Sequence, residues 1–413
     1  MSTWYAGAGR AVVKLTDQHF PTAEGYVGVR GEMAVRALYV ESEEKALIVT
    51  VEQTSIMSQT MAIFRRTAAE KSGVAEDRIW ITATHTFGVP HIWDDDAGRL
   101  KNDEDRRRNT MMQRAFADAV AEAASAAVKT KQVVRIGYAE TVCNVNINRD
   151  LLTAEGYWLG PNEAGLSDKT VAVVRFENLN GDPVGIFFNY GVQSSVTQGV
   201  SKLMCGDLAS AACDYLEREY GVPAIFCVGA CGDQAPVLQG KSFETDRNGK
   251  LRELGISTEA AFGIADLLGA RLGKAAAAAA GQALCSVPEG RLKAAQVTID
   301  CPGQKMLPIP ELHPTFNYDY VSQGRTPLEI EALDLGDVIL IGAKPEMTAQ
   351  LGISLKQCAH GKVILCNMVN GAAKYLAHDS AYASCTYPAM NSRYARGSGE
   401  LFLSAALELM ETL

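Results

Sequence analysis

The chemistry-bearing residues of this chain include a histidine loop at 82–91. His85 follows the largely apolar run 78–81, which indicates a buried strand, and Gly88 and Pro90 end that strand. An imidazole delivered by the carboxyl end of a strand is well placed to bind a metal or transfer a proton. A lone histidine at a strand end more often bonds to backbone groups, so the other segments must decide.

Thiols are the second reactive group. The chain has ten cysteines, scattered through apolar segments, a usage typical of small buried thiols in a cytosolic protein. Cys227 and Cys231 are four apart without a second pair at zinc-finger spacing, which argues against a structural zinc knuckle. Cys205 and Cys231 each precede a Gly-Asp pair, but no adjacent histidine supports a thiol nucleophile at either.

Strands and helices alternate around these residues. The first half predicts strands over 46–51, 78–81, 133–138 and 224–229, a hairpin of 171–176 with 184–189, and helices over 58–72, 103–129 and 207–220. The second half predicts helices over 258–284, 347–358 and 399–410 and strands over 291–299, 328–333, 338–341 and 362–366. This alternation indicates an α/β protein whose mixed β-sheets are covered by helices. The Pro- and Gly-rich segment 302–327 predicts a long lid-like loop.

Composition limits the partners. A hydrophobic content of 47% and a charged content of 21% are those of an ordinary globular protein, and 413 residues suffice for one large α/β domain. A net charge of −9 argues against nucleic acid or an anionic membrane as the main partner. No secretory signal or membrane-spanning run stands out, so we expect a cytoplasmic protein with no stable membrane association.

Seven segments, taken in order, resemble motifs of the neutral, non-lysosomal ceramidase family. The loop 82–91 resembles the family's Ala-Thr-His-Thr-His-Ser-Gly-Pro motif, and 229–236 is similar to its Gly-Ala-x-Gly-Asp-x-x-Pro turn. The other matching segments are 6–10, 146–149, 344–348, 370–375 and 391–400. The resemblance implies that family's catalytic-domain fold over 1–413, without its separate β-rich C-terminal domain.

The resemblance also implies a site. That family hydrolyses the amide bond between a fatty acid and an amino alcohol, with zinc bound by two histidines, a glutamate and a tyrosine. His85, Glu346 and Tyr375 match three of these ligands. Gln193 stands where the second histidine is expected, and Phe87 replaces another motif histidine.

Gln193 changes what the site is expected to bind. An amide oxygen is a poorer zinc donor than an imidazole, so the set implies weak zinc binding, another divalent metal or none. His378, three residues after Tyr375, is a candidate substitute ligand. His91 is a second one, or a catalytic residue in its own right. The acidic run 94–96 is a further source of oxygen ligands.

Two more residues match site positions of the family. Arg149 corresponds to its site arginine and Tyr387 to its second site tyrosine, which implies that both stabilise the oxyanion of a tetrahedral intermediate. The alternatives are a structural ion pair for Arg149 and a buried, hydrogen-bonded ring for Tyr387.

Three functions remain open at this point. The first is a metal-dependent hydrolase of a carbon–nitrogen bond, acting on a small soluble substrate rather than ceramide. The second is a metal-independent isomerase, lyase or lactam hydrolase that uses His85, Glu346 and Tyr375 directly. The third is a non-catalytic binding protein. The sequence indicates neither the substrate nor the oligomeric state.

Overall fold

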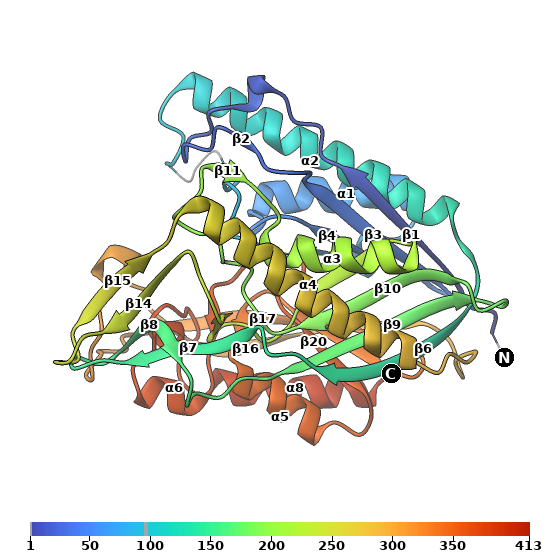
Figure 1. Cartoon of the computed structure of the whole chain (residues 1–413). Coiled ribbons are helices and arrows are strands. Elements are labelled where there is room, and N and C mark those ends of the chain that lie inside the picture. The colour runs from blue at the N-terminus through green and yellow to red at the C-terminus, as the bar shows by residue number, and fades with distance from the viewer. Residues whose placement is uncertain (1, 95–97) are drawn as a thin grey trace.

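The large sheet sets the architecture of the molecule. The computed structural model describes residues 2–94 and 98–413 and confirms the predicted α/β class. Helices, a large sheet, a smaller sheet and further helices follow one another in layers (Figure 1). The spatial order of the large sheet is β12 (Ala224–Val228), β10 (Pro183–Tyr190), β9 (Thr170–Asn178), β6 (Gln132–Val142), β1 (Tyr5–Val12), β3 (Ala34–Glu41), β4 (Lys45–Val51) and β5 (Ile79–Ala83).

The sequence of the central strands explains why this sheet is covered on both faces. In β12, Ala224, Phe226 and Val228 pack into the core beneath the helices, while Ile225 and Cys227 pack toward the smaller sheet. Successive side chains of a strand point to opposite faces, so an uninterrupted apolar run needs cover on both sides. The same alternation occurs along β4 and β10.

The first helix layer consists of α1 (Ser58–Ser72), α2 (Asp103–Lys129), α3 (Asp207–Tyr220) and α4 (Thr258–Gln282). In α2, Phe116, Val120 and Ala127 are among the buried residues that recur every three or four positions and form the stripe that faces the sheet. Asn102 caps this helix by accepting a hydrogen bond from the Asp105 amide.

The smaller sheet lies on the other face of the large one. Its order is β16 (Lys293–Gln304), β17 (Ser322–Asp334), β18 (Ile339–Ala343) and β20 (Val363–Cys366), and α5 (Ala349–Cys358) and α8 (Ser398–Glu411) cover its outer face. The remaining short elements are β2 (Gly28–Val29), β7 (Asn146–Leu152), β8 (Tyr157–Asn162), β11 (Leu203–Met204), β13 (Gln234–Pro236), β14 (Lys241–Thr245), β15 (Leu251–Gly255), β19 (Glu346–Met347), β21 (Tyr375–Leu376), α6 (Asp379–Ala383) and α7 (Tyr387–Met390).

Three differences from the predicted elements matter. Strands β1 and β3 were not predicted, although both lie inside the large sheet. The helix predicted over 347–358 begins two residues later, at Ala349, because Glu346 and Met347 form β19. The predicted loop over 302–327 is shorter, since β16 extends to Gln304 and β17 begins at Ser322, which leaves 305–321 irregular apart from a short 3-10 turn.

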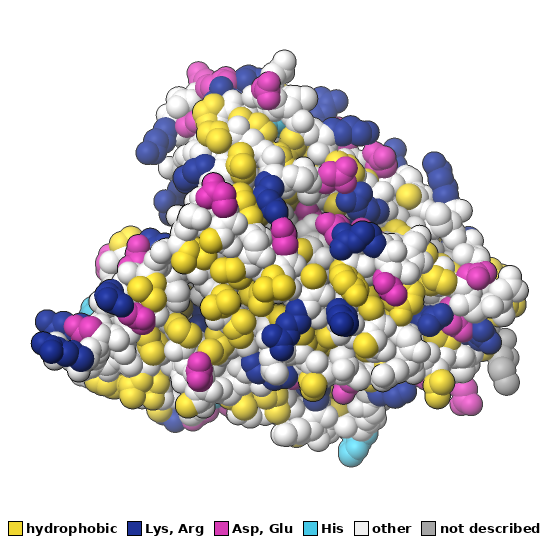
Figure 2. Space-filling model, in the orientation of Figure 1, with side chains coloured by type: hydrophobic (Ala, Val, Ile, Leu, Met, Phe, Trp, Pro, Cys, Tyr) yellow, Lys and Arg dark blue, Asp and Glu magenta, His cyan; other side chains and the backbone are white. Residues whose placement is uncertain are grey.

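The face of the molecule seen in Figure 2 carries a mixture of side-chain types. Figure 2 shows apolar side chains interspersed with charged ones over the face on which α4 lies. Within the part of the chain that the structure describes, no helix is long and apolar enough to cross a membrane.

Candidate functional site

The candidate site lies where parallel strands end. Strand β5 pairs in parallel with β4, and β10 pairs in parallel with β12. His85 follows β5, Gln193 follows β10, Cys231 follows β12, and Glu346 lies in β19, a few residues beyond β18. The carboxyl ends of parallel strands meet at one edge of a sheet, which is where α/β proteins commonly bind ligands.

His85 is held in one orientation from its backbone outward. Its φ is 57°, in the left-handed region that non-glycine residues rarely adopt. The ring nitrogen Nδ1 lies 2.6 Å from the Thr54 carbonyl oxygen. A carbonyl can only accept, so Nδ1 carries a proton and donates it. Nε2 then faces Glu346 Oε2 at 3.0 Å, which is close enough for an ion pair although the two atoms do not meet hydrogen-bond geometry.

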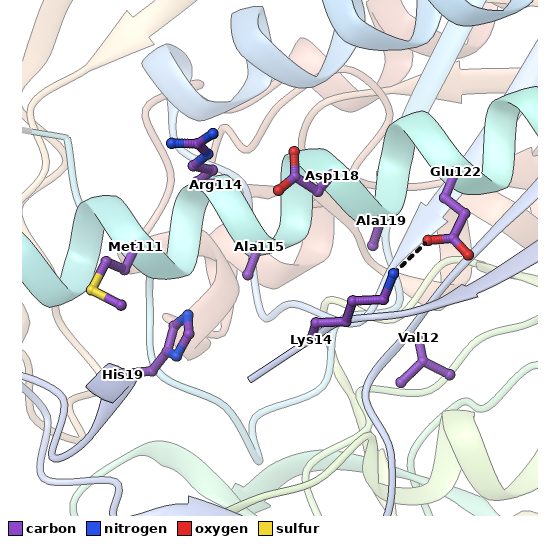
Figure 3. A pocket seen from close by; sticks show the side chains of 9 residues that line it. All are labelled: Val12, Lys14, His19, Met111, Arg114, Ala115, Asp118, Ala119 and Glu122. Atoms are coloured by element: carbon purple, nitrogen blue, oxygen red, sulfur yellow. Dashed lines mark hydrogen bonds and ion pairs between the residues drawn. The ribbon is translucent and has the colours of Figure 1, made fainter. Parts of the chain in front are cut away.

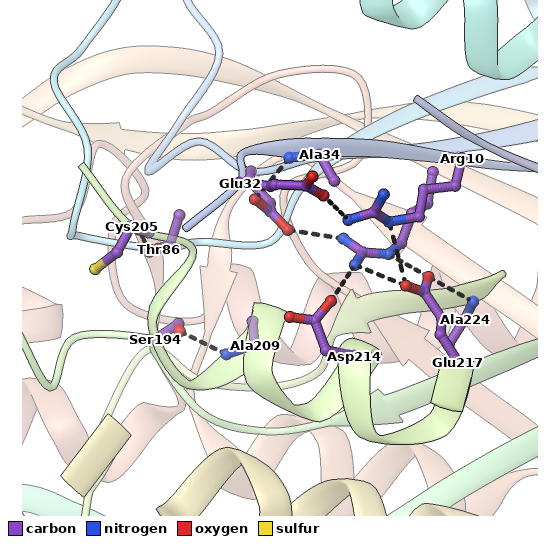
Figure 4. A network of polar contacts seen from close by, with 12 residues as sticks. Arg10, Glu32, Ala34, Thr86, Ser194, Cys205, Ala209, Asp214, Glu217 and Ala224 are labelled. Carbon is purple, nitrogen blue, oxygen red and sulfur yellow. Dashed lines mark hydrogen bonds and ion pairs between the residues drawn. The ribbon is translucent and has the colours of Figure 1, made fainter. Parts of the chain in front are cut away.

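Backbone and side-chain bonds fasten the His85 loop to the Gln193 loop. The Ser194 amide donates to the His85 carbonyl at 3.1 Å, and the Phe87 amide donates to the Ser194 carbonyl at 2.8 Å. Thr86 and Ser194 also anchor the two loops to the Cys205 carbonyl and the Ala209 amide at the start of α3 (Figure 4). Such outer bonds fix the geometry of the groups that face the site.

A chain of hydrogen bonds links Glu346 to Arg149. Gln193 Nε2 donates to Glu346 Oε2 at 2.6 Å, and Arg149 donates to Gln193 Oε1 at 2.9 Å. A guanidinium only donates, so it fixes the amide with its oxygen toward Arg149 and its nitrogen toward Glu346. Gln193 therefore offers Glu346 a donor and offers the space beside His85 no free amide oxygen.

Two tyrosines complete the site. Arg149 donates to the Tyr375 hydroxyl at 2.9 Å and to the Gly232 carbonyl, and its guanidinium carbon lies 5.6 Å from the Tyr375 ring centre and 5.8 Å from that of Tyr387. The two tyrosine rings meet edge to face at 5.8 Å. Because the Tyr375 oxygen accepts from Arg149, its own proton is free to be donated elsewhere.

The electrostatics keep Glu346 charged and Tyr375 neutral. Burial alone would raise the pKa of the Glu346 carboxyl, but the adjacent His85, Arg149 and Gln193 bring it below its ordinary value. Burial, followed by the charge of Glu346, raises the pKa of Tyr375 far above its ordinary value. The site thus presents an anion and a protonated phenol at neutral pH.

Cys231 is the residue whose place in the site the sequence did not reveal. Among the described residues, the donor atoms of His85, Cys231 and Glu346 lie within 4.8 Å of one another, and all three side chains are buried. Asn367 donates to Cys231 Sγ at 3.8 Å. Burial and then the charge of Glu346 raise the pKa of this thiol well above its ordinary value.

Other candidates have different partners. His91 Nδ1 lies 3.1 Å from Glu24 Oε1, and the His91 ring stacks on Trp93 at 4.6 Å. His378 Nδ1 bonds with the Thr348 hydroxyl at 2.9 Å. The structure does not bring either histidine into contact with His85 or Glu346.

Two further features lie outside this cluster. In the acidic run 94–96, Asp94 accepts from the Gln59 amide, while Asp95 and Asp96 fall outside the described residues. An open hollow of about 300 Å³ between the end of β1 and α2 is lined by Lys14, His19 and Glu122, among others, and shares no residue with the site (Figure 3).

Comparison with solved structures settles the fold. The crystal structure of neutral ceramidase from Pseudomonas aeruginosa matches this chain with a TM-score of 0.77 at 17% sequence identity, covering 100% of this chain and 75% of that one. The chain has the fold of the neutral ceramidases. A ceramidase complexed with C2 matches with a TM-score of 0.75, also at 17% identity and over 100% of this chain.

Sequence comparison is much weaker. No family model matches the chain. Neutral ceramidase of Drosophila pseudoobscura pseudoobscura is 30% identical over 114 residues, a stretch that spans 24% of this chain and only 16% of that relative. The ceramidase-like resemblance of the motifs is therefore confirmed in the fold, on a strongly divergent sequence.

Proposed function

We propose that the protein is a hydrolase that cleaves the carbon–nitrogen bond of an amide or a lactam in a small soluble substrate. The reaction would use a divalent metal, and zinc is the first candidate. The observation that carries this proposal is that two buried side chains of metal-ligand type, His85 and Glu346, bring Nε2 and Oε2 to within 3.0 Å of each other. An imidazole whose Nδ1–H is held by a carbonyl has its Nε2 oriented to bind a metal, which is the usual arrangement of a histidine ligand.

The residues present fit a metal at this place. His85 and Glu346 would hold it, since a neutral imidazole and a carboxylate are both zinc donors. A metal bound there would supply an activated water and polarise the scissile carbonyl. The likeness to ceramidase folds supports the same chemistry.

The chain's own groups would handle the charge that develops on the substrate. We assign the Tyr375 hydroxyl as the donor to the oxyanion, because its oxygen accepts from Arg149 and its proton is unused. Arg149 would position Tyr375 and Gln193, since its guanidinium donates a hydrogen bond to each. Tyr387, whose hydroxyl accepts from Asn391, would line the site with its ring.

We also assign a lid to the segment 305–321. Leu312 packs with Tyr375 and Tyr387 in one apolar cluster, and Leu307, Tyr318 and Trp158 pack against it. The lid would therefore offer the substrate an apolar surface next to the two tyrosines, which favours a substrate with an apolar portion. In this proposal 1–413 acts as one domain.

We place this domain in the cytoplasm. All ten cysteines are free thiols in the structure, as is usual in a reducing compartment. Its partners in this proposal are small molecules, with no stable membrane contact.

A panel of N-acyl amines and lactams, read by release of the amine or ring opening, tests the proposal. Turnover should depend on added zinc, stop with a chelator, and vanish in Glu346→Gln. Tyr375→Phe should lower kcat by about 10²–10³-fold, the usual cost of one oxyanion donor. Tyr394→Phe is the matched control, a buried tyrosine that bonds to the Pro327 carbonyl instead.

A second candidate function needs no metal. Glu346 already accepts from Gln193 at 2.6 Å, so the carboxylate has a partner without a cation, and His85 is near enough to exchange a proton with it. Turnover that survives the chelator and still requires Glu346 would favour this candidate. If neither wild type nor variants turn over any member of the panel, the third alternative, a binding protein, replaces both.

A further inference from the structure

Gln193 occupies the position at which the ceramidase-type ligand set has a histidine, and the thiol of Cys231 lies on the neighbouring strand end. We propose that Cys231 is the third protein ligand of the metal, so that the site binds its cation through one imidazole, one carboxylate and one thiolate. This inference rests on the metal-binding part of the proposed function and not on the reaction or the substrate.

The strand order places Cys231 beside Gln193. Strands β10 and β12 are parallel neighbours, with Tyr190 opposite Val228. Gln193 lies three residues beyond Tyr190, and Cys231 lies three residues beyond Val228. A donor can therefore move from one strand end to the next without a change in the fold.

Close backbone packing then fixes the thiol near Glu346. The Gly232 amide donates to the Met347 carbonyl at 2.8 Å, so the turn that carries Cys231 lies against β19. A Cβ on Gly232 would approach the Glu346 carbonyl oxygen to 2.8 Å, which is closer than real Cβ atoms come. Only glycine lets the turn approach this closely.

The three donor atoms have the chemistry that zinc requires and come close to its spacing. They lie within 4.8 Å of one another, and tetrahedral ligands at 2.0–2.3 Å from one zinc are about 3.3–3.8 Å apart, so the side chains would move inward slightly on binding. Thiolate is a preferred zinc ligand, and the Asn367 N–H directed at Sγ is the kind of outer bond that supports one. On binding, the thiol would release its proton to solvent.

The charges also balance. One thiolate and one carboxylate neutralise a divalent cation, and the neutral imidazole completes the set. Gln193 then keeps a separate role, as the donor that orients Glu346 from the side of Arg149.

The test measures the metal and needs no substrate. Apoprotein loaded with Co²⁺ should show a near-ultraviolet thiolate-to-cobalt charge-transfer band that is absent in Cys231→Ala and in Cys231→His. Zinc affinity, measured by competition with a chromophoric chelator, should fall more than about 100-fold in Cys231→Ala, since losing outer partners alone costs 10–100-fold. Cys231→His should have a zinc affinity close to that of the wild type, because an imidazole is also a zinc ligand.

Cys227→Ala is the matched control. Cys227 lies on the same strand and is equally buried, but its sulfur points to the Thr82 hydroxyl at 3.9 Å. This variant should keep both the band and the affinity. The charge-transfer band of the cobalt-loaded wild-type protein is informative by itself. The test therefore does not depend on whether Cys231→Ala folds.

Two results would overturn the inference. One is bound cobalt without a thiolate band, and the other is wild-type protein that takes up neither metal. Failure of the amide and lactam panel with the band present removes the proposed reaction and leaves the ligand assignment standing. Chelator-sensitive turnover without the band supports the proposed reaction and removes the assignment of Cys231 as a ligand.

Discussion

Gly232→Ala tests whether the turn after β12 sets the geometry of the site. The added methyl group would meet the Glu346 carbonyl oxygen at 2.8 Å and the Met347 carbonyl oxygen at 3.1 Å. Both are backbone atoms of β19 and cannot rotate away, so the turn must move by about 0.5 Å, an overpacking change that typically costs about 1–3 kcal/mol. At about 2 cal/mol/K of unfolding entropy per residue, this lowers the Tm of the chain by only about 1–4 °C.

The expected loss of function is larger than the loss of stability. The Gly232 carbonyl accepts two hydrogen bonds from Arg149, which in turn holds Gln193 and Tyr375. Displacing that carbonyl shifts the whole chain of bonds, and a misplacement of this size can lower turnover by about 10–100-fold. Metal affinity should fall as well, since Cys231 is the preceding residue.

The Tm, the metal affinity and the turnover rate of Gly232→Ala should be measured on one preparation, by calorimetry, metal titration and activity assay. Gly263→Ala is the control, because this exposed glycine lies within α4 with no atom within 4 Å of the new Cβ. It should gain about 0.5–1 kcal/mol from helix propensity and leave the site unchanged. Wild-type metal affinity and turnover in Gly232→Ala would refute the reasoning.

Two further predictions concern buried charge. Arg36 donates to Glu52 at 2.7 Å and to Glu217, which is labelled in Figure 4, at 2.6 Å. Arg36→Met leaves the buried Glu52 without its cation and should cost about 3–5 kcal/mol in denaturant unfolding. An unchanged unfolding midpoint would contradict this. Burial and the nearby Asp233 raise the pKa of Asp150 to about 8. The folded state therefore keeps a proton that the unfolded chain releases near pH 4. As a result, the free energy of unfolding falls as the pH rises between these two values. In Asp150→Asn that decline should be weaker in thermal scans from pH 5 to pH 8; parallel profiles would show that Asp150 is not protonated in the fold.

The sequence predicted the layers of this fold better than its sheet order. Uninterrupted apolar runs such as that of β12 show which strands are buried on both faces. β1 and β3 escaped prediction because Gly7 and Gly9 interrupt one, and Arg36 lies within the other. The burial of Arg36 becomes intelligible only with Glu52 beside it, and these residues meet through the pairing of β3 with β4.

The sequence predicted which residues form the site but not how all of their side chains are oriented. Motif resemblance named His85, Arg149, Glu346, Tyr375 and Tyr387, and the structure brings these five together through the contacts described above. Gln193 could be identified as a departure, but the direction of its amide depends on Arg149. That orientation is a property of the hydrogen-bond network and is not visible in the order of residues.

The role proposed for Cys231 illustrates how a ligand set could change within a fold without leaving a sequence signal. A substitute sought along the chain leads to the histidines nearest in sequence, His91 and His378, and both have other partners in the structure. A substitute sought across the sheet leads to the strand that pairs with β10, where the equivalent position is Cys231. Strand pairing decides which side chains meet at the site, and two residues 38 positions apart in the printed sequence occupy neighbouring strand ends. Replacement of a histidine by a glutamine on one strand therefore need not abolish metal binding when a thiol on the next strand faces the same carboxylate.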